Sequence, residues 1–187
     1  MGRLSREQIV QLGFAAVGAD VAISDRCSIY GAESISIGNH VRIDDFAILT
    51  ARQPMVIGSY VHISAFAFLS GPFGIVIEDF VNVGPRAALM SGTDDFTGQW
   101  LPGPVVPEEL RNVQGGRIHL GRHSIVGPHS VVLRGVTFGD GAAVGALSLV
   151  KESLAPWSIY GGVPARLIGP RSRRVEELAA RLSAEAS

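Results

Sequence analysis

Residues 120–155 read LGRHSI-VGPHSV-VLRGVT-FGDGAA-VGALSL-VKESLA when they are divided into groups of six. The first position is apolar in every group, the second is glycine in four of the six, and the fifth is Ser, Val, Ala or Leu. Chance rarely gives such a pattern over 36 residues. A fixed short period of this kind is the signature of a repeat architecture, in which each unit stacks on the next.

The same phase continues upstream of this stretch. Groups of six with the same pattern begin at residues 17, 23, 37, 43, 57, 63, 77 and 83. The starts at 37, 57 and 77 give a 20-residue step, and those at 120 and 138 an 18-residue step. The interval from 77 to 120 is 43 residues, about 23 more than one step, so an excursion is predicted at about 90–117.

The repeat has a direct physical interpretation as a parallel β-helix. The first residue of each group points inward and stacks on its counterpart one coil away. The fifth also points inward, into a narrower space, and is therefore usually small. Glycine at the second position eases the bend between two sides, where a Cβ would crowd the turn. One coil cannot bury its apolar face alone, but stacked coils can, and each strand then pairs above and below.

The N-terminal segment, residues 1–14, is expected to form a helical cap on the open end of the β-helix. Ser5 followed by Gln8 is a capping box at the start of a short helix. Ile9 and Leu12 then give this helix one apolar face.

The C-terminal segment, residues 171–187, is also expected to be helical, which leaves 15–170 for the β-helix. Ser172 precedes a helical pattern with Val175, Leu178 and Leu182 on one face. This helix is interpreted as a packing element or a contact between subunits.

The composition excludes several classes of function. The 187 residues are 47% hydrophobic and 18% charged, with a net charge of −1, so neither nucleic acid nor an acidic membrane surface is expected as a partner. No apolar run is long enough for a signal peptide or a membrane span, and a cytoplasmic location is expected. Cys27 is the single cysteine, which precludes an intrachain disulfide; it is interpreted as a small buried side chain.

The repeat and the tail IYGGVPARLIGPRSR, residues 159–173, resemble the hexapeptide acyltransferase superfamily in the branch of the galactoside, maltose and xenobiotic acetyltransferases. The loop SGTDDFTG at 91–98, followed by PVVPEE at 104–109, is similar to sugar acetyltransferases of surface-polysaccharide clusters. The resemblance covers about 15–170. It implies an all-β fold, a left-handed parallel β-helix, a homotrimer, acetyl-CoA as co-substrate and no metal.

The sequence departs from this branch at its catalytic histidine. The galactoside and maltose enzymes place that histidine at the start of the loop, where this chain has Asp94 and then Asp95, and no histidine occurs in 63–118. The pair has two interpretations. One carboxylate orients a histidine of a neighbouring subunit or holds the ammonium of an amino sugar, or the pair simply caps turns. Glu108 and Glu109 are interpreted as a solvated loop face.

Acyl transfer needs a group that takes the proton of the attacking hydroxyl or amine, and histidine has a suitable pKa. His62 is expected to point outward, in a polar column with Arg42 and Asn82. His123 is expected to point outward over Phe80. Both are candidate bases. Of the other histidines, His40 and His119 are interpreted as residues without a functional role, and His129 as a structural residue or a contact to CoA.

The coenzyme side of the site follows from the resemblance. In this branch CoA lies along a groove between subunits, beside the last coils. Small residues that let the backbone approach the pantetheine match Gly127, Pro128, Gly145 and Ala146. Cationic side chains for the phosphates match Lys151 and Arg166, with Arg171 nearby.

Together these features predict an acetyl-CoA-dependent O- or N-acetyltransferase. Its expected acceptor is a nucleotide-linked or glycan-bound sugar in surface polysaccharide biosynthesis. An amine acceptor is attractive because an amine is already nucleophilic and tolerates the loss of the loop histidine. The alternatives are a non-catalytic β-helix, either a scaffold or a decayed enzyme, and a zinc enzyme of the γ-carbonic anhydrase type. The latter has only His119 and His123 at close spacing and does not match that family's pattern.

Overall fold

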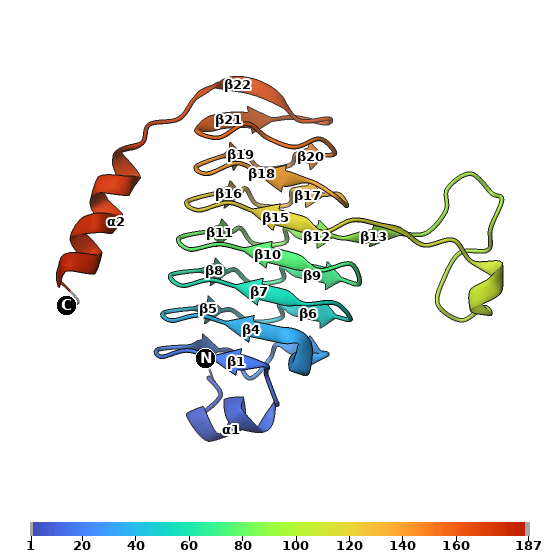
Figure 1. Cartoon of the computed structure of the whole chain (residues 1–187), viewed down its shortest axis with the longest axis horizontal. Helices are drawn as coiled ribbons and strands as arrows, with labels where there is room; N and C mark the ends of the chain where they lie inside the picture. Colours follow the sequence, from blue (N-terminus) through green and yellow to red (C-terminus); the bar gives the residue numbers. More distant parts are fainter. Residues whose placement is uncertain (1, 186–187) are drawn as a thin grey trace.

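The computed structural model describes residues 2–185 and is a parallel β-helix (Figure 1). Three sheets run along it, one on each side of the coil, and their strands are parallel except for the last one, β22. The first sheet contains β1 (Ala16–Val17), β4 (Ile35–Ile37), β7 (Met55–Ile57), β10 (Ile75–Ile77), β15 (Ile118–Leu120) and β18 (Thr137–Phe138). The second sheet contains β2 (Ala22–Ile23), β5 (Arg42–Ile43), β8 (His62–Ile63), β11 (Asn82–Val83), β16 (Ile125–Val126), β19 (Ala143–Val144), β21 (Ser158–Gly161) and β22 (Arg166–Pro170). The third sheet contains β3 (Ser28–Tyr30), β6 (Ile48–Ala51), β9 (Phe68–Gly71), β12 (Ala88–Met90), β17 (Val131–Val132) and β20 (Leu149–Val150).

The strand register confirms the repeat that the sequence predicts. Ile37 pairs with Ile57 and Ile57 with Ile77, which is the 20-residue step. Leu120 pairs with Phe138, which is the 18-residue step, and Ile77 pairs with Leu120 across the excursion. The chain therefore rejoins the same sheet in phase after the excursion.

The core is a stack of first-position side chains from successive coils. Ile43, Ile63 and Val83 pair in register in the second sheet and are at most 1% exposed. Ala47 and Ala67 occupy fifth positions and are fully buried, which confirms the small inward residue there. Burial of each large aliphatic side chain contributes about 1.5–3 kcal/mol, so the stack is the main source of stability.

Glycine at the second position is required by the close approach of adjacent coils. A Cβ on Gly58 would lie 2.8 Å from the carbonyl carbon of Glu78 in the next coil. On Gly127 it would lie 2.5 Å from the carbonyl carbon of Gly145. Backbone cannot move aside as the end of a side chain can, which explains the predominance of glycine here.

One corner of the coil carries a column of stacked rings, which joins the first sheet to the second. His40, Tyr60, Phe80, His123 and Trp157 all have left-handed backbone, with φ between 53° and 61°. Centroids of successive rings lie 4.6–6.2 Å apart. The left-handed conformation is unfavourable for bulky residues, and ring stacking offsets part of that cost. The stacking of His123 on Phe80 confirms the sequence prediction.

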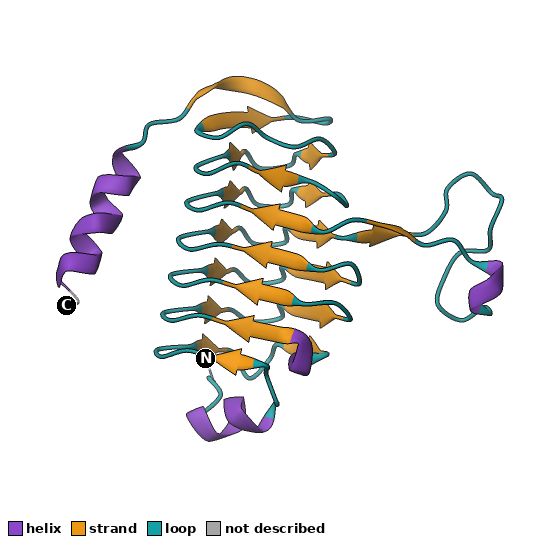
Figure 2. Cartoon of the chain, viewed as in Figure 1, coloured by secondary structure: helices purple, strands orange, loops and turns teal. Residues whose placement is uncertain are grey.

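The excursion leaves the corner between the third and first sheets (Figure 2). It begins with an antiparallel two-stranded stalk of β13 (Gly92–Thr93) and β14 (Gln114–Gly115) and contains the 3₁₀ helix η2 (Glu108–Leu110). It projects away from the coils to the right in Figure 1. These bounds agree with the predicted excursion at about 90–117.

A helix lies near each end of the described residues, within the segments 1–14 and 171–187 where the sequence predicts one; residues 1, 186 and 187 lie outside the described residues. Helix α1 (Arg6–Gln11) begins at the Ser5–Gln8 capping box; Ile9 is 1% exposed, but Leu12 is 39% exposed and lies outside the core. A further 3₁₀ helix, η1 (Ala32–Ser34), interrupts an early corner.

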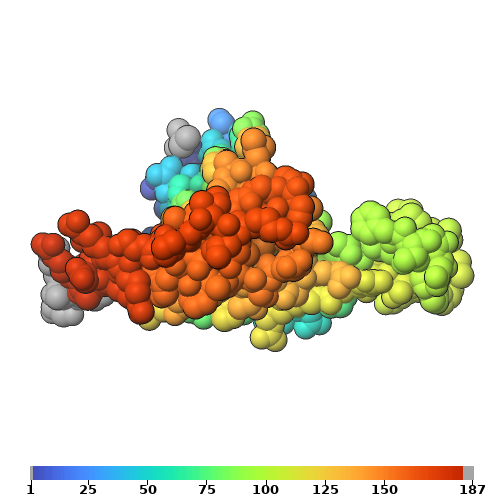
Figure 3. Space-filling view, turned by 90° about the horizontal axis from the view of Figure 1, so that it is seen from above, coloured from blue at the N-terminus to red at the C-terminus, as the bar shows by residue number. Residues whose placement is uncertain are grey.

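Helix α2 (Arg174–Glu185) lies on the side of the coils opposite the excursion (Figure 3). Its apolar residues Val175, Leu178 and Leu182 line a groove of about 320 Å³ against Phe80 and Ile125. Within residues 2–185, no helix has the length and apolar character that crossing a membrane requires.

Cys27 is partly buried at the edge of the core. Burial raises the pKa of its thiol to about 11, and the thiol donates to the carbonyl oxygen of Asp44 at 3.1 Å. A thiol that stays protonated is a poor nucleophile, in agreement with the structural role predicted for it.

Candidate active site

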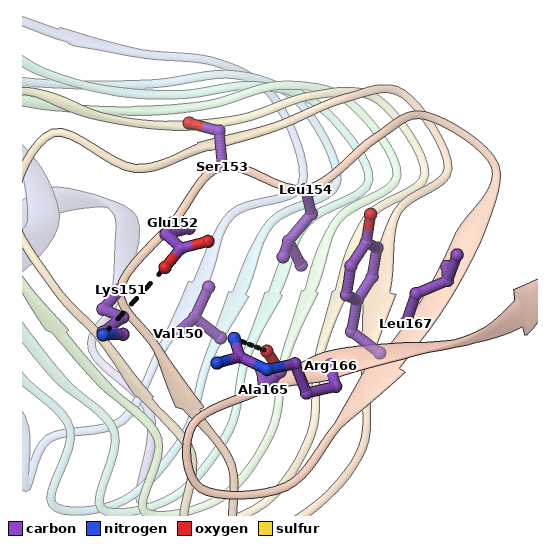
Figure 4. Close-up of a pocket in the computed structure, with 9 residues that line it drawn as sticks. Val150, Lys151, Glu152, Ser153, Leu154, Ala165, Arg166 and Leu167 are labelled. Carbon is purple, nitrogen blue, oxygen red and sulfur yellow. Dashed lines mark hydrogen bonds and ion pairs between the residues drawn. The ribbon is translucent and has the colours of Figure 1, made fainter.

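The last coil holds a small pocket between two cationic side chains (Figure 4). Lys151 follows β20, and Arg166 begins β22, the strand that folds back antiparallel over β21. The pocket has a volume of about 130 Å³, and Val150, Leu154 and Tyr160 form its apolar side.

Neither cation is fully engaged within the described residues. Lys151 Nζ lies 4.0 Å from Glu152 Oε1, and Arg166 Nη1 donates to the carbonyl oxygen of Ala165 at 3.3 Å. The fold thus brings together two cations that are 15 residues apart in the sequence, and they provide donors for an anionic group.

The four small residues predicted to face the coenzyme lie at one corner, between the second and third sheets. Gly127 and Gly145 are stacked in adjacent coils, and the N–H of Gly127 donates to the carbonyl oxygen of Val144 at 2.9 Å. Pro128, Gly145 and Ala146 are exposed. Three of the four predicted residues are thus at the surface of this corner, and Gly127 is buried beneath them.

His62 points outward from the second sheet and bridges two other coils. Its Nε2 donates to Asp44 Oδ2 at 2.7 Å, and its Nδ1 lies 3.1 Å from Asn82 Oδ1. Partial burial favours the neutral carboxyl of Asp44, but hydrogen bonds from His62 and Arg42 outweigh it and lower its pKa. Both ring nitrogens of His62 are therefore engaged by the chain itself.

His123 is 9% exposed and lies between Phe80 and Trp157 in the ring column. Burial lowers the pKa of its imidazole, and the neighbouring guanidinium groups of Arg122 and Arg171 lower it further. Arg171 Nη1 donates to the carbonyl oxygens of His123 at 2.7 Å and Gly141 at 2.8 Å. The lowered pKa favours the neutral ring, and Arg171, in the segment that leads into helix α2, holds the backbone of His123 in place.

The two aspartates at the base of the excursion, Asp94 and Asp95, differ in how many hydrogen bonds their carboxylates accept. Asp95 accepts hydrogen bonds from the Thr97 N–H at 3.1 Å, the Thr97 hydroxyl at 2.9 Å and the Gln99 N–H at 3.1 Å. Loss of solvent disfavours its charged form slightly, but these bonds outweigh that effect and lower the pKa of Asp95. This carboxylate shapes its own turn.

Asp94 makes a single bond of this kind. Its Oδ2 accepts from the Gly103 N–H at 3.1 Å, and its Oδ1 has no hydrogen-bond partner in the described structure. The side chain is half-buried beside the stalk. Of the two carboxylates, Asp94 is the one with an oxygen available to a ligand.

The candidate catalytic residues do not meet within one chain. His62 lies on the second sheet and His123 at its edge, whereas Asp94 lies on the excursion from the opposite corner (Figures 1 and 3). His119 points from the first sheet, where its Nε2 lies 2.7 Å from Glu78 Oε1, and it therefore does not converge with His123. In the part of the chain that the structure describes, no three His, Cys, Asp or Glu side chains cluster in a way that suits a metal.

Three residues near the candidate sites were not predicted from the sequence: Asp44, Arg52 and Arg111. Their contacts join one coil to another, or the excursion to a coil. Asp44 occupies the second position of its group, where glycine is usual, and that exception is the available signal. Arg52 and Arg111 line a common cavity beneath the excursion. No periodic pattern extends into the loop, so nothing in the sequence pairs these two residues.

Comparison with known proteins gives relatives over nearly the whole chain. No family model matches the sequence. An Escherichia coli dTDP-4-amino-4,6-dideoxy-D-glucose acyltransferase is 39% identical over 179 residues, which are 95% of this chain and 93% of the relative.

Solved structures agree with this relationship. AntD, an N-acyltransferase from Bacillus cereus, has been solved with dTDP-4-amino-4,6-dideoxyglucose and coenzyme A; it is 44% identical, with a TM-score of 0.94, over 98% of this chain and 97% of its own. A hexapeptide-repeat acetyltransferase from Vibrio cholerae, 18% identical with a TM-score of 0.61 over 89% of this chain and 77% of its own, shares the fold. The chain therefore belongs to the hexapeptide-repeat family of sugar acyltransferases and is an acyl-CoA-dependent acyltransferase.

Proposed function

We propose that this enzyme transfers an acyl group from acyl-CoA to the amine of a nucleotide-linked amino sugar. The observation that carries the proposal is Asp94, a half-buried carboxylate with one free oxygen, at the place where the resembling O-acetyltransferases have histidine. A carboxylate suits an ammonium or amine better than a hydroxyl that must be deprotonated. The E. coli relative is named for an amino sugar, and AntD is named an N-acyltransferase; AntD has been solved as alanine and asparagine variants of an aspartate.

The reaction needs little from the protein beyond binding and orientation. The neutral amine attacks the thioester carbonyl, the C–N bond forms, the C–S bond breaks, and the amine proton leaves with the thiol product. Asp94 would hold the amine through its free oxygen and so fix its lone pair toward the thioester. Fixed geometry of this kind accounts for a large part of the rate of a two-substrate reaction.

The coenzyme would lie along the last coils. Lys151 and Arg166 would bind its phosphates at the terminal pocket. The backbone at Gly127, Pro128, Gly145 and Ala146 would contact the pantetheine. Both cations are exposed and lie beside a concave surface, as a phosphate site requires.

The two candidate histidines would serve as positioning residues. Both nitrogens of His62 are engaged by Asp44 and Asn82, so the ring orders the surface of the second sheet. His123 is enclosed by rings and by the segment leading into α2, so it would support the adjacent corner rather than accept a proton.

We further propose that the chain works as a homotrimer, in which the excursion of one subunit covers the coils of the next. Phe96 and Val105, on the excursion, are each 92% exposed, and Phe46 and Phe66 form an exposed stacked pair on the corner between the second and third sheets. Apolar surface of this extent on an isolated chain indicates a contact with a partner.

The experiment is an assay of thiol release. Acetyl-CoA and 3-hydroxybutyryl-CoA would each be offered with dTDP-4-amino-4,6-dideoxyglucose, with other nucleotide-linked amino sugars and with their hydroxyl counterparts. Turnover with an amino sugar is expected, and none with the hydroxyl counterpart. Asp94→Asn should lower kcat/KM about 100-fold, which corresponds to about 2.7 kcal/mol of transition-state stabilisation. Asp95→Asn is the matched control: it should act through loop stability and lower kcat/KM less. Equal losses, or turnover of the hydroxyl sugar alone, would overturn the proposal.

A further inference from the structure

A second cavity lies beneath the return limb of the excursion, away from the terminal pocket. It has a volume of about 370 Å³. Arg52, Pro72 and Phe73 form its floor, and they come from two successive turns at the corner between the third and first sheets. Its roof comes from the excursion itself, from Glu108, Arg111, Asn112 and Val113.

Arg111 is incompletely satisfied in this cavity. Its Nη1 donates to the carbonyl oxygen of Gly103 at 3.4 Å, but its Nε is buried and has no hydrogen-bond partner in the described structure. A buried guanidinium N–H without a partner costs free energy. An acceptor that enters the cavity would complete the hydrogen bonding of this arginine.

The charges in the cavity favour an anionic acceptor. Neither Arg52 nor Arg111 forms an ion pair with any carboxylate among residues 2–185. Glu108 is the single acidic residue in the lining, so the two guanidinium groups exceed it by one charge. Planar guanidinium groups bind phosphate through two parallel N–H donors.

The remaining lining suits the other parts of a nucleotide. Phe73 is 38% exposed and is held in place because its N–H donates to Ser91 Oγ at 3.0 Å and its ring packs under Gly115. Its ring and Pro72 provide an apolar wall for a base. Glu108 and Asn112 provide acceptors for a sugar hydroxyl or a base edge.

The cavity is connected to Asp94 through a single residue, Gly103. The carbonyl oxygen of Gly103 accepts from Arg111, and the N–H of Gly103 donates to Asp94 Oδ2. An anion that fixes Arg111 would therefore also fix the loop that positions the Asp94 carboxylate. This arrangement suits an acceptor that carries its amine at one end of a sugar ring and a diphosphate at the other.

We propose that Arg52 and Arg111 bind the diphosphate of the nucleotide-linked acceptor in this cavity, with Phe73 against the base. The inference rests on the proposed function, because it assumes a nucleotide-linked acceptor. A diphosphate occurs both in a nucleotide sugar and in CoA, and the two sources are separated by measuring each substrate independently.

The test uses binding as well as turnover. Calorimetric titration of the full-length enzyme with dTDP alone needs no acyl transfer. Arg111→Gln and Arg52→Gln should each weaken dTDP binding about tenfold or more, as expected for one lost charge-assisted contact. Arg111→Lys, which keeps the charge but loses Nε and the planar fork, should recover part of the affinity. Arg181→Gln, on the exposed face of α2, is the matched control and should bind as the parent does.

Steady-state kinetics then show whether the cavity binds the diphosphate of the nucleotide sugar or that of CoA. The arginine variants should raise the KM for the nucleotide sugar about tenfold or more while the KM for acyl-CoA stays within about twofold. A rise in the KM for acyl-CoA instead would assign the cavity to the coenzyme and overturn the proposal. Parent-like dTDP binding by both glutamine variants would also overturn it, while acylation of the nucleotide sugar would leave the proposed function standing. If the parent neither binds dTDP nor acylates any nucleotide sugar, the proposed function fails first. Arg52 is exposed at a corner, so its variant tests the cavity even if Arg111→Gln unfolds.

Discussion

The coils and the excursion differ in how much of their apolar surface they bury and in how far their backbone is paired. In the coils, first-position residues such as Leu69 and Ile77 are fully buried, and each strand pairs with the coil above and the coil below. In the excursion, Phe96 and Val105 are 92% exposed, and the stalk of β13 and β14 is its only regular strand pairing among the described residues. The coils bury their apolar side chains within one chain, whereas the excursion leaves large apolar side chains exposed. We infer that the coils supply most of the stability, and that the excursion contributes mainly to the site and to assembly.

The largest expected effect on stability lies in the coils. Leu69→Ala should lower the free energy of unfolding by about 2–5 kcal/mol, because it removes a buried side chain and leaves a cavity between stacked coils. The matched change Phe96→Ala in the excursion should alter it by less than about 0.5 kcal/mol. Denaturant titration of both variants at one protein concentration makes the comparison. Similar losses from both would show that the excursion is part of the folded core.

The next effect concerns the terminal pocket. Lys151→Gln and Arg166→Gln should each raise the KM for acyl-CoA about tenfold, through the loss of one phosphate contact, and leave unfolding almost unchanged. Arg134→Gln, at the corner between Lys151 and the excursion, is the control; its side chain bonds Gln114. An unchanged KM for acyl-CoA in both pocket variants would place the coenzyme elsewhere.

A smaller effect is expected at the cross-coil bridge of Asp44, whose pKa is lower when folded than when unfolded. The stability that the ionised carboxylate of Asp44 gives to the fold is therefore fully present above the pKa of the unfolded chain, about 3.9. It is lost as the pH falls through the lower pKa of the folded state. Asp44→Asn should cost about 1 kcal/mol at pH 7, and the cost should shrink as the pH falls below 4. Denaturant titrations at several pH values test this. A cost that stays constant down to pH 2 would mean that packing, not charge, is lost.

The smallest effect on folding, but a clear one on assembly, is expected for the double variant Phe96→Ser and Val105→Ser. Both side chains are almost fully exposed on the chain, so unfolding should change by less than about 0.5 kcal/mol. Sedimentation should show a weaker trimer and the assay a lower rate. A parent-like trimer with parent-like activity would show that the excursion covers no neighbour.

The coils could be predicted from the sequence because their physics is local and repeated. Position in the six-residue group fixes whether a side chain points inward, and Ile37, Ile57 and Ile77 fall in register for this reason. The capping box at Ser5 is local in the same way. The ring column could be predicted only where one pair, His123 and Phe80, stood out.

The site was less predictable because its contacts are not periodic. The partition of roles between Asp94 and Asp95 depends on which carboxylate the turn at Thr97 uses, and the sequence is silent on that. The pairing of Arg52 with Arg111 depends on how the excursion folds back over the corner. A site that adjacent subunits would form together cannot be predicted from the repeat, because the repeat describes only the contacts within one chain.

The most direct test of the central claim is the chemical nature of the product. The enzyme would be incubated with acetyl-CoA and dTDP-4-amino-4,6-dideoxyglucose, and the acylated nucleotide sugar would be treated with mildly alkaline hydroxylamine and followed by mass spectrometry. An N-acyl product is an amide and should survive the treatment unchanged. An O-acyl ester that hydroxylamine removes would contradict the assignment of the amine as the acceptor and of Asp94 as the residue that holds it.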